Sequence, residues 1–223
     1  MGAGGFDLVL FDCDGVLVDS EHLSARSTAV VLREVGVDMD EATVLRRFMG
    51  TSDKSMCTAL AAEFGVTFPP DMQRRLDEAA LELSARELRA IPGVADLVQG
   101  LALPYAVASS STPERIRRSL ELTGLWELLG RHVFSATMVE RGKPAPDLFL
   151  HAAQRMGAAP ARTVVIEDST AGVAAGKAAG MTVIGFTGGS HVDSAVHAAK
   201  LRDLGADVVV DAMDDVRRLV AAG

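Results

Sequence analysis

Cysteine is scarce in this chain, and its scarcity excludes two classes of protein. Only Cys13 and Cys57 occur in 223 residues, and two thiols so far apart form neither a disulfide framework nor a zinc site. One alternative for Cys13 is a nucleophile, because it lies between two aspartates. Strand alternation turns its side chain away from the face of Asp12 and Asp14, so we expect a buried thiol in the core.

Long apolar runs and excess positive charge are also missing. No run is long enough to span a bilayer, and none resembles the apolar region of a signal peptide. Lys and Arg number 22 against 30 Asp and Glu, a net charge of −8. This charge argues against nucleic acid or an anionic membrane as the main partner. We expect a cytoplasmic protein, a monomer by default, in which an anionic substrate needs a locally positive pocket.

The most informative segment that is present is DLVLFDCDGVLVDS at 7–20. Its run of apolar residues at 8–11 predicts a strand buried on both faces, and the first polar residue after it, Asp12, marks the end of that strand. Asp14 follows two positions later, so the two carboxylates point the same way if the backbone is still extended. Paired like charges are costly without a cation or a shared proton. The segment therefore predicts a metal, a proton-transfer role, or both.

The rest of the chain shows two kinds of apolar pattern, which predict an α/β fold with an inserted helical domain. Short β-branched runs at 105–109, 132–136, 163–167, 182–186 and 207–211 alternate with helical segments. With 8–11 they predict a Rossmann-like, doubly wound parallel sheet of six strands. Between about 21 and 90 the apolar spacing is helical instead, with stripes at Met56, Leu60, Phe64 and at Met72, Leu76, Ala80, Leu83. We expect a catalytic core at 1–20 and 91–223, and a helical cap at 21–90 that acts as a lid.

Polar groups of one chemical kind follow several of the predicted strands. Asp12 follows the first strand, Ser109, Ser110 and Ser111 end the second, and Glu167 with Asp168 ends the fourth. The carboxyl ends of parallel strands lie on one edge of a sheet, so we expect these groups to converge there. Carboxylate and hydroxyl oxygens suit Mg²⁺, and Lys143 in RGKPAPD supplies a positive charge for phosphate. Together they predict a phosphoryl-transfer site.

Four motifs in this order carry a resemblance to a known family. They are FDCDG at 11–15, VASSS at 107–111, the lysine of RGKPAPD, and VVIEDS at 164–169. The chain resembles the haloacid dehalogenase-like hydrolase superfamily, in the helical-cap branch that contains sugar-phosphate phosphatases and β-phosphoglucomutase. Dehalogenase members lack the two-aspartate pattern, so Asp14 indicates phosphate chemistry.

The resemblance implies a role for each residue. Asp12 is the expected nucleophile that forms an aspartyl-phosphate, and Asp14 the expected general acid and base. Ser109 is expected to bind a phosphoryl oxygen and Lys143 to neutralise its charge. The expected Mg²⁺ is held by Asp12, the backbone carbonyl of Asp14 and Asp168, with Glu167 either a direct ligand or one step removed.

Less specific roles exist for most of these residues. Ser109 is one candidate for the cap of the helix near Pro113, although Ser111 or Thr112 is better placed. Glu167 or Asp168 is a candidate cap of the following helix, and a lysine such as Lys143 is most often solvated. Gly172 and Gly176 are expected to let that helix lie close on the sheet. The sequence gives His151 and His197 only structural or surface roles.

Substrate selection is expected to come from the cap. The candidate substrate-binding residues are Glu21, His22, Arg26, Arg46, Arg47 and Lys54 of the cap, together with Ser110 of the core. In β-phosphoglucomutases the corresponding cap positions carry a lysine, an arginine and a histidine, where this chain has Met49, Asp53 and Ser24. Loss of these groups favours hydrolysis of a small phosphate ester, such as a sugar or polyol phosphate, over a sugar-phosphate mutase. A non-catalytic binding protein is a third possibility, which the complete motif set disfavours.

Overall fold

The chain folds into two compact units. The computed structural model describes residues 5–48, 53–191 and 194–222. The core unit consists of Met1–Asp19 and Arg89–Gly223, and the helical unit is Ser20–Leu88. Within the described residues, no helix is long and apolar enough to cross a membrane.

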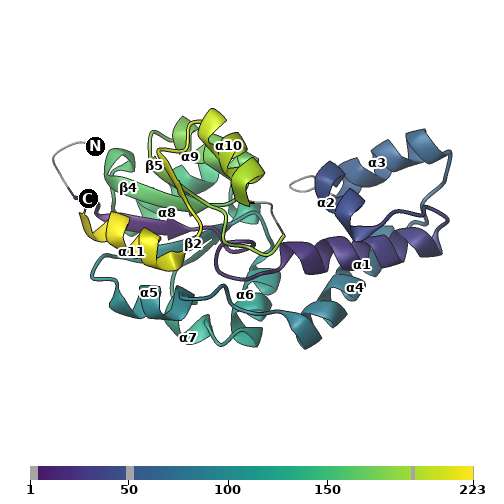
Figure 1. Ribbon diagram of the computed structural model, residues 1–223, viewed down its shortest axis with the longest axis horizontal. Coiled ribbons are helices and arrows are strands. Elements are labelled where there is room, and N and C mark those ends of the chain that lie inside the picture. Colours follow the sequence, from purple (N-terminus) through teal and green to yellow (C-terminus); the bar gives the residue numbers. More distant parts are fainter. Residues whose placement is uncertain (1–4, 49–52, 192–193, 223) are drawn as a thin grey trace. The chain divides into compact units, whose positions relative to one another are not determined.

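The core unit is built on a six-stranded parallel sheet (Figure 1). Its strands are β1 (Leu8–Phe11), β2 (Tyr105–Ser109), β3 (Val133–Ser135), β4 (Thr163–Glu167), β5 (Thr182–Phe186) and β6 (Val208–Val210). They lie in the order β3-β2-β1-β4-β5-β6, which is the order of a doubly wound Rossmann-type sheet. The predicted fold class is therefore confirmed. The strand order reverses between β1 and β4, and in such sheets ligands bind beside the carboxyl ends at this point.

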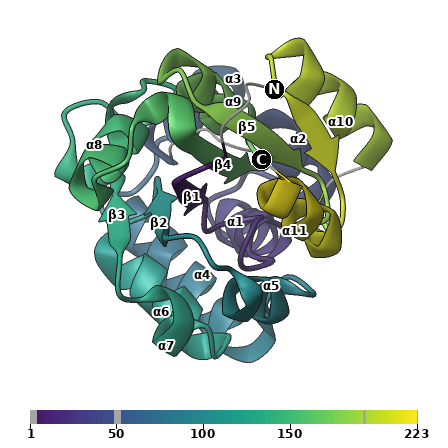
Figure 2. The same cartoon turned by 90° about the vertical axis from the view of Figure 1, so that its left-hand side faces the viewer.

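Helices cover both faces of this sheet (Figure 2). On one face lie α8 (Asp147–Met156), α9 (Thr170–Ala178) and α10 (Ser194–Asp203). On the other lie α5 (Val94–Gly100), α6 (Pro113–Leu122), α7 (Trp126–Leu129) and α11 (Met213–Ala222). Two 3₁₀ turns, η1 (Ala136–Met138) and η2 (Pro160–Arg162), complete the described elements of this unit. Leu8 and Leu10 are fully buried in the cluster that also contains Leu148 and Phe149 of α8.

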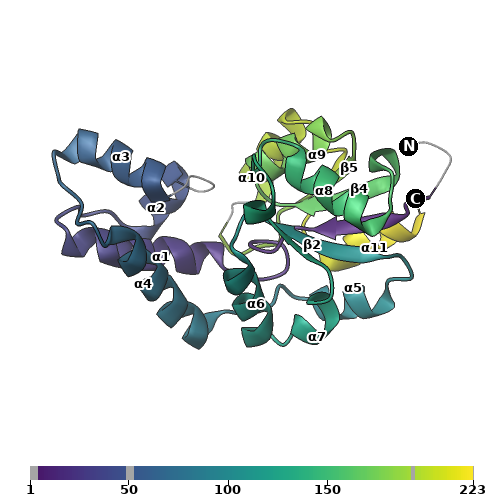
Figure 3. The same cartoon turned by 180° about the vertical axis from the view of Figure 1, so that it is seen from behind.

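The helical unit consists of α1 (Glu21–Glu34), α2 (Glu41–Phe48), α3 (Asp53–Phe64) and α4 (Met72–Glu87). Helix α1 packs along α4 and also contacts α2 (Figure 3). As the helical spacing predicts, Met56, Leu60, Met72 and Leu76 are buried in one cluster. Phe64, the last residue of α3, is 44% exposed, and Ala80 and Leu83 of α4 are only partly buried.

The close approach of α9 to the sheet depends on Gly176, as the sequence predicts. A Cβ atom at this position would lie 2.6 Å from Cγ2 of Val183 on β5 and 3.7 Å from Cγ2 of Val165 on β4. Both valines are fully buried, so the helix cannot move away without opening the core.

We expect Gly176→Ala to destabilise the protein by about 1–3 kcal/mol, because the added methyl group overpacks the interface between α9 and the sheet. Gly100→Ala is the matched control. Gly100 is also helical, but a Cβ there would meet nothing within 4 Å, so this change should be neutral or stabilise by up to about 1 kcal/mol. Urea denaturation of both variants measures the difference. Equal effects of the two substitutions would contradict the packing argument.

Candidate active site

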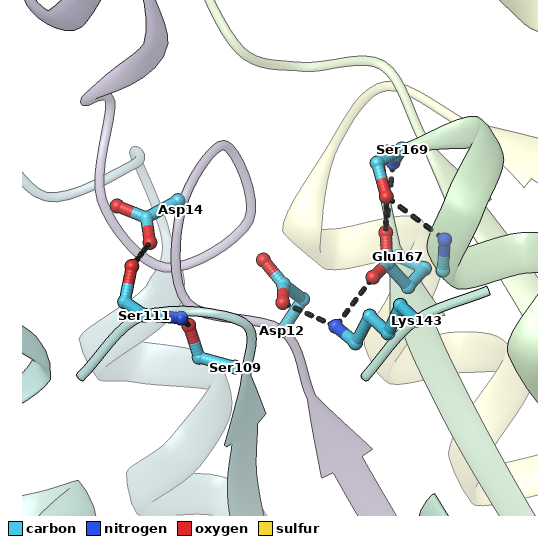
Figure 4. A network of polar contacts seen from close by, with 8 residues as sticks. Asp12, Asp14, Ser109, Ser111, Lys143, Glu167 and Ser169 are labelled. Atoms are coloured by element: carbon cyan, nitrogen blue, oxygen red, sulfur yellow. Dashed lines mark hydrogen bonds and ion pairs between the residues drawn. The ribbon is translucent and has the colours of Figure 1, made fainter. Parts of the chain in front are cut away.

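The candidate site lies at the carboxyl edge of the sheet, around β1, β2 and β4 (Figure 4). The Asp12 backbone N–H still donates to the Ile166 carbonyl of β4, at 3.0 Å. The ladder therefore extends to Asp12, and alternation places its side chain on the same face as Leu10. Ser109 and Glu167 are the last residues of β2 and β4, and Asp168 follows directly. Asp12, Ser109, Glu167 and Asp168 are all buried.

Lys143 connects the ends of β1 and β4 from the segment that precedes α8. Its Nζ lies 2.5 Å from Oδ1 of Asp12 and 2.6 Å from Oε1 of Glu167. The side chain is 3% exposed, and Nζ also lies 4.8 Å from the centroid of the Phe149 ring. Burial by itself would lower the pKa of Lys143, but the charges and hydrogen bonds of Asp12 and Glu167 raise it above the ordinary lysine value. The predicted lysine is therefore a buried ammonium group and not a solvated side chain.

The carboxylates around Lys143 repel one another. Burial raises the pKa of Asp12 well above its ordinary value, with Glu167, Asp168 and Asp14 acting in the same direction and Lys143 opposing them. Burial likewise raises the pKa of Asp168, with further contributions from Glu167 and Asp14. The site thus has more negative charge than Lys143 compensates, and a bound cation would relieve the excess.

Glu167 is fixed through both of its carboxylate oxygens. Oε1 accepts from Lys143, and Oε2 accepts from the Ser169 backbone N–H at 2.7 Å and from its hydroxyl at 2.9 Å. Ser169 is the N-cap of α9, and its Oγ accepts from the Gly172 N–H. The alternative that Glu167 or Asp168 caps this helix is therefore wrong. A Cβ at Gly172 would lie 1.7 Å from Oε1 of Glu167, so this glycine makes room for the carboxylate.

Asp14 is held by Ser111, which the sequence placed among the hydroxyls at the end of the second strand and also suggested as a helix cap. The hydroxyl of Ser111 donates to Oδ2 of Asp14 at 2.7 Å, and its backbone N–H donates to Oγ of Ser109 at 3.1 Å. The carbonyl of Ser111 accepts from the hydroxyl of Ser135 at 2.7 Å. Thr112 is the N-cap of α6. Of the three cap candidates, Thr112 is therefore the cap. Ser109 and Ser111 do not cap α6, and both lie at the candidate site.

Asp168 contacts two histidines, neither of which sequence analysis placed in the site. His191 Nε2 lies 3.2 Å from Oδ2 of Asp168. His197 is buried in α10, with Nε2 2.5 Å from the Asp168 carbonyl oxygen. Burial lowers the pKa of His197, which favours a neutral ring. The helical spacing around His197 indicated a structural or surface residue, and only the fold brings it to Asp168.

The residues available to a metal ion are few. Among the residues that the structure describes, no three His, Cys, Asp or Glu side chains form a cluster that could hold one. Both oxygens of Glu167 are already bonded, which argues against the alternative of a direct ligand. The carboxylates of Asp12 and Asp168 remain, with the backbone carbonyl of Asp14 as a third oxygen. This set fits Mg²⁺, which keeps several waters and takes one or two protein carboxylates.

The predicted substrate residues lie mainly in the helical unit. Arg26 pairs with Glu87 at 2.5 Å, and Arg47 forms a double hydrogen bond with Glu63. Arg46 donates to Thr43 at 2.8 Å. Glu21 and His22 begin α1, Lys54 lies in the first turn of α3, and Ser110 is an exposed residue of the core unit. Met49, used in the comparison with mutases, lies outside the described residues. Contact of these residues with a substrate stays a prediction.

Comparison with known proteins gives one consistent family. The family model described as haloacid dehalogenase-like hydrolase matches residues 9–186. The 6-phosphogluconate phosphatase of Escherichia coli K12 is 31% identical over 192 residues, covering 86% of this chain and 87% of that protein. Hexitol phosphatase A of the same organism is 35% identical and covers 78% of this chain and 80% of its own. The β-phosphoglucomutase of Mycobacterium bovis is 31% identical, with 90% and 87% covered.

A solved structure gives the same result. A hydrolase of this family from Deinococcus radiodurans R1, with bound phosphate and sodium, is 38% identical to this chain. It superimposes with a TM-score of 0.81 over 97% of this chain and 96% of its own. The similarity therefore includes both units of the chain.

We expect Lys143→Met to destabilise the protein by about 3–5 kcal/mol at about pH 8, because it leaves buried carboxylates without their cation. Without Lys143, the factors that raise the pKa of Asp12 act unopposed. The folded variant then binds a proton more tightly than the unfolded chain. Its stability should fall as pH rises from the ordinary aspartate pKa towards the raised one, so the loss is smaller at about pH 5.5.

The control for this prediction is Lys177→Met. Lys177 pairs with Asp207 at 2.7 Å, but its side chain is 34% exposed, so the loss should be at most about 1 kcal/mol at either pH. Chemical denaturation at the two pH values measures both variants. A similar, pH-independent loss for the two lysines would show that Lys143 does not neutralise buried carboxylates.

Proposed function

Because the chain belongs to the haloacid dehalogenase-like hydrolase family, we propose that it is a Mg²⁺-dependent phosphatase of a small sugar or polyol phosphate. The chain is a phosphoric monoester hydrolase, as several of its relatives are. The observation that carries the proposal is the buried Lys143 ammonium group between Asp12 and Glu167. It fixes one carboxylate at the end of β1 and supplies positive charge for a phosphoryl group beside it.

Asp12 is the proposed nucleophile. Lys143 holds its Oδ1, and we assign Oδ2 as the oxygen that attacks phosphorus in line with the leaving oxygen. The bond from Oδ2 to phosphorus forms as the ester bond breaks, which gives an aspartyl-phosphate. The ammonium group of Lys143 offsets part of the charge on the transferred phosphoryl group. Ser109, buried at the end of β2, is the proposed donor to a phosphoryl oxygen.

Asp14 is the proposed general acid and base. It gives its proton to the leaving alkoxide in the first step, and in the second it takes a proton from the water that attacks the aspartyl-phosphate. The hydroxyl of Ser111 holds Oδ2 of Asp14, so Oδ1 is the oxygen assigned to the moving proton. The second step releases inorganic phosphate and restores the Asp12 carboxylate.

Asp12, Asp168 and the backbone carbonyl of Asp14 are the proposed ligands of Mg²⁺. When bound, the ion supplies charge neutralisation and orientation for the carboxylate nucleophile and the phosphoryl group. Glu167 is assigned instead as a positioning residue, because Lys143 and Ser169 engage both of its oxygens. It holds Lys143 where the ammonium group also meets Asp12.

The helical unit is the proposed source of substrate selection, through Glu21, His22 and Lys54, with Ser110 of the core unit. Phosphatases of 6-phosphogluconate and hexitol phosphates among the relatives support a sugar or polyol phosphate. The mutase among the relatives keeps a second candidate open. The carboxylate of Asp53 accepts a hydrogen bond from Gln73 within the helical unit, at 2.8 Å. Asp53 therefore places a negative charge at the position where mutases have a cationic side chain. This observation favours hydrolysis.

Asp12→Asn should reduce Mg²⁺-dependent hydrolysis of p-nitrophenyl phosphate by about 10⁴-fold or more, because the amide does not attack phosphorus. Cys13→Ala is the matched control, since Cys13 is the next residue and equally buried but points away from Asp12. Its activity should stay within a few-fold of the wild type. A phosphate-release assay measures both. Full activity of Asp12→Asn would overturn the proposed nucleophile.

A panel of phosphate esters tests the substrate class. With saturating Mg²⁺, we expect stoichiometric release of inorganic phosphate from one or more sugar or polyol phosphates, at higher kcat/KM than from p-nitrophenyl phosphate. The gain should come from contacts beyond the phosphate. Conversion of β-glucose 1-phosphate to glucose 6-phosphate without phosphate release would overturn the phosphatase in favour of the mutase. Absence of any turnover and of phosphate binding would favour a non-catalytic protein.

A further inference from the structure

The segment that follows β5 reaches the candidate site at Asp168, although the proposed reaction uses none of its residues. It contains Gly188, Gly189, Ser190 and His191, and α10 begins shortly after it at Ser194. His191 and His197, here called the histidine pair, both have buried side chains. Buried imidazoles require polar surroundings. Nε2 of His197 is hydrogen-bonded to the backbone carbonyl of Asp168, and Nε2 of His191 lies within ion-pair distance of the Asp168 carboxylate.

His191 holds the carboxylate of Asp168 on one side. Its Nε2 lies 3.2 Å from Oδ2. Gly15 approaches the same oxygen, because a Cβ at that glycine would lie 2.0 Å from it. Oδ2 of Asp168 is therefore close to both the His191 ring and the backbone of Gly15, which limits the orientations open to the carboxylate.

His197 holds the backbone of the same residue. Its Nε2 lies 2.5 Å from the Asp168 carbonyl oxygen. A carbonyl oxygen only accepts, so Nε2 carries the proton and donates it. The main chain and the side chain of Asp168 are thus contacted by two different imidazoles.

The same segment is tied to the loop that carries Asp12 and Asp14. The Ser190 backbone N–H donates to Oδ1 of Asp19 at 3.1 Å. A Cβ at Gly189 would lie 3.3 Å from the Gly15 carbonyl oxygen, so the two backbones run close together. Asp168 is therefore held relative to the nucleophile loop and not only relative to its own strand.

We propose that the histidine pair consists of positioning residues that hold Asp168 in the orientation in which it binds a divalent cation. This inference rests on the proposed function, because it takes Asp168 as a ligand of Mg²⁺. Oδ2 is directed by His191, and Oδ1 is assigned to the cation. Partners that orient a metal ligand contribute strongly to affinity, and their loss weakens metal binding by roughly 10–100-fold.

The test measures binding of Mg²⁺ by calorimetry and of Mn²⁺ by electron paramagnetic resonance, both in the absence of substrate. His191→Phe and His197→Phe keep a planar ring but remove its nitrogen atoms, and each should weaken metal affinity by roughly 10–100-fold. His191→Gln and His197→Gln keep an N–H donor and should bind metal within a few-fold of the wild type. KM for p-nitrophenyl phosphate at saturating metal should change little in all four variants.

His151→Phe is the matched control. His151 of α8 is also partly buried, but its ring packs edge-on against Phe134 with centroids 5.6 Å apart, so its replacement should leave metal affinity unchanged. Melting temperatures without metal report folding. Where a phenylalanine variant does not fold, the smaller His191→Leu or His197→Leu replaces it.

The outcomes separate this inference from the proposed function. A wild type that binds neither metal and hydrolyses no phosphate ester would overturn the proposed function. A wild type that does both, with folded phenylalanine or leucine variants that bind metal as tightly as His151→Phe, would overturn the inference alone. Loss of affinity in the glutamine variants equal to that in the phenylalanine variants would also count against it, since the donor would then not matter.

Discussion

The buried ammonium group of Lys143 is the interaction on which the site depends. Asp12, Asp14, Glu167 and Asp168 place negative charge at one edge of the sheet, where burial penalises charge. Lys143 contacts two of these residues at 2.5 and 2.6 Å. Its positive charge opposes the rise in the pKa of Asp12 that burial causes, yet it does not offset the whole cluster. The remaining negative charge favours the binding of a divalent cation at the site.

The sheet provides the convergence that this electrostatic arrangement requires. Strand β1 lies between β2 and β4, so the residues at the ends of three strands meet although more than 150 positions separate Asp12 from Asp168. Glycines allow the close approaches around them. Gly15 lies against the carboxylate of Asp168, and Gly172 lies against that of Glu167. A Cβ at either glycine would clash with the neighbouring carboxylate.

Much of the fold and of the candidate site was predictable from the sequence, and the features that were not predictable have physical causes. Short β-branched runs predicted the six parallel strands, and the polar residues at or directly after the carboxyl ends of three of them marked Asp12, Ser109 and Glu167. The stripe through Phe64 predicted a helix correctly but not the exposure of that residue, because a helical stripe does not show where the helix ends. Ser169 and His191 were not expected as site residues, and Ser111 was expected at this edge of the sheet without a partner being assigned to it. Their positions depend on the conformation of loops, which leaves no periodic pattern in the sequence. Single serines and histidines also have many common structural roles.

Three carboxylates of the site are each contacted through one oxygen by a polar group of different character. Lys143 holds Oδ1 of Asp12, the Ser111 hydroxyl holds Oδ2 of Asp14, and His191 lies against Oδ2 of Asp168. In the proposed reaction these differences match the roles. An ammonium group favours the ionised form that a nucleophile needs. A hydroxyl adds no net charge, so Asp14 can alternate between acid and base. An imidazole orients Asp168 and leaves its second oxygen for the cation. In this proposal the polar group beside each carboxylate, more than the carboxylate itself, therefore determines the different roles of the three aspartates.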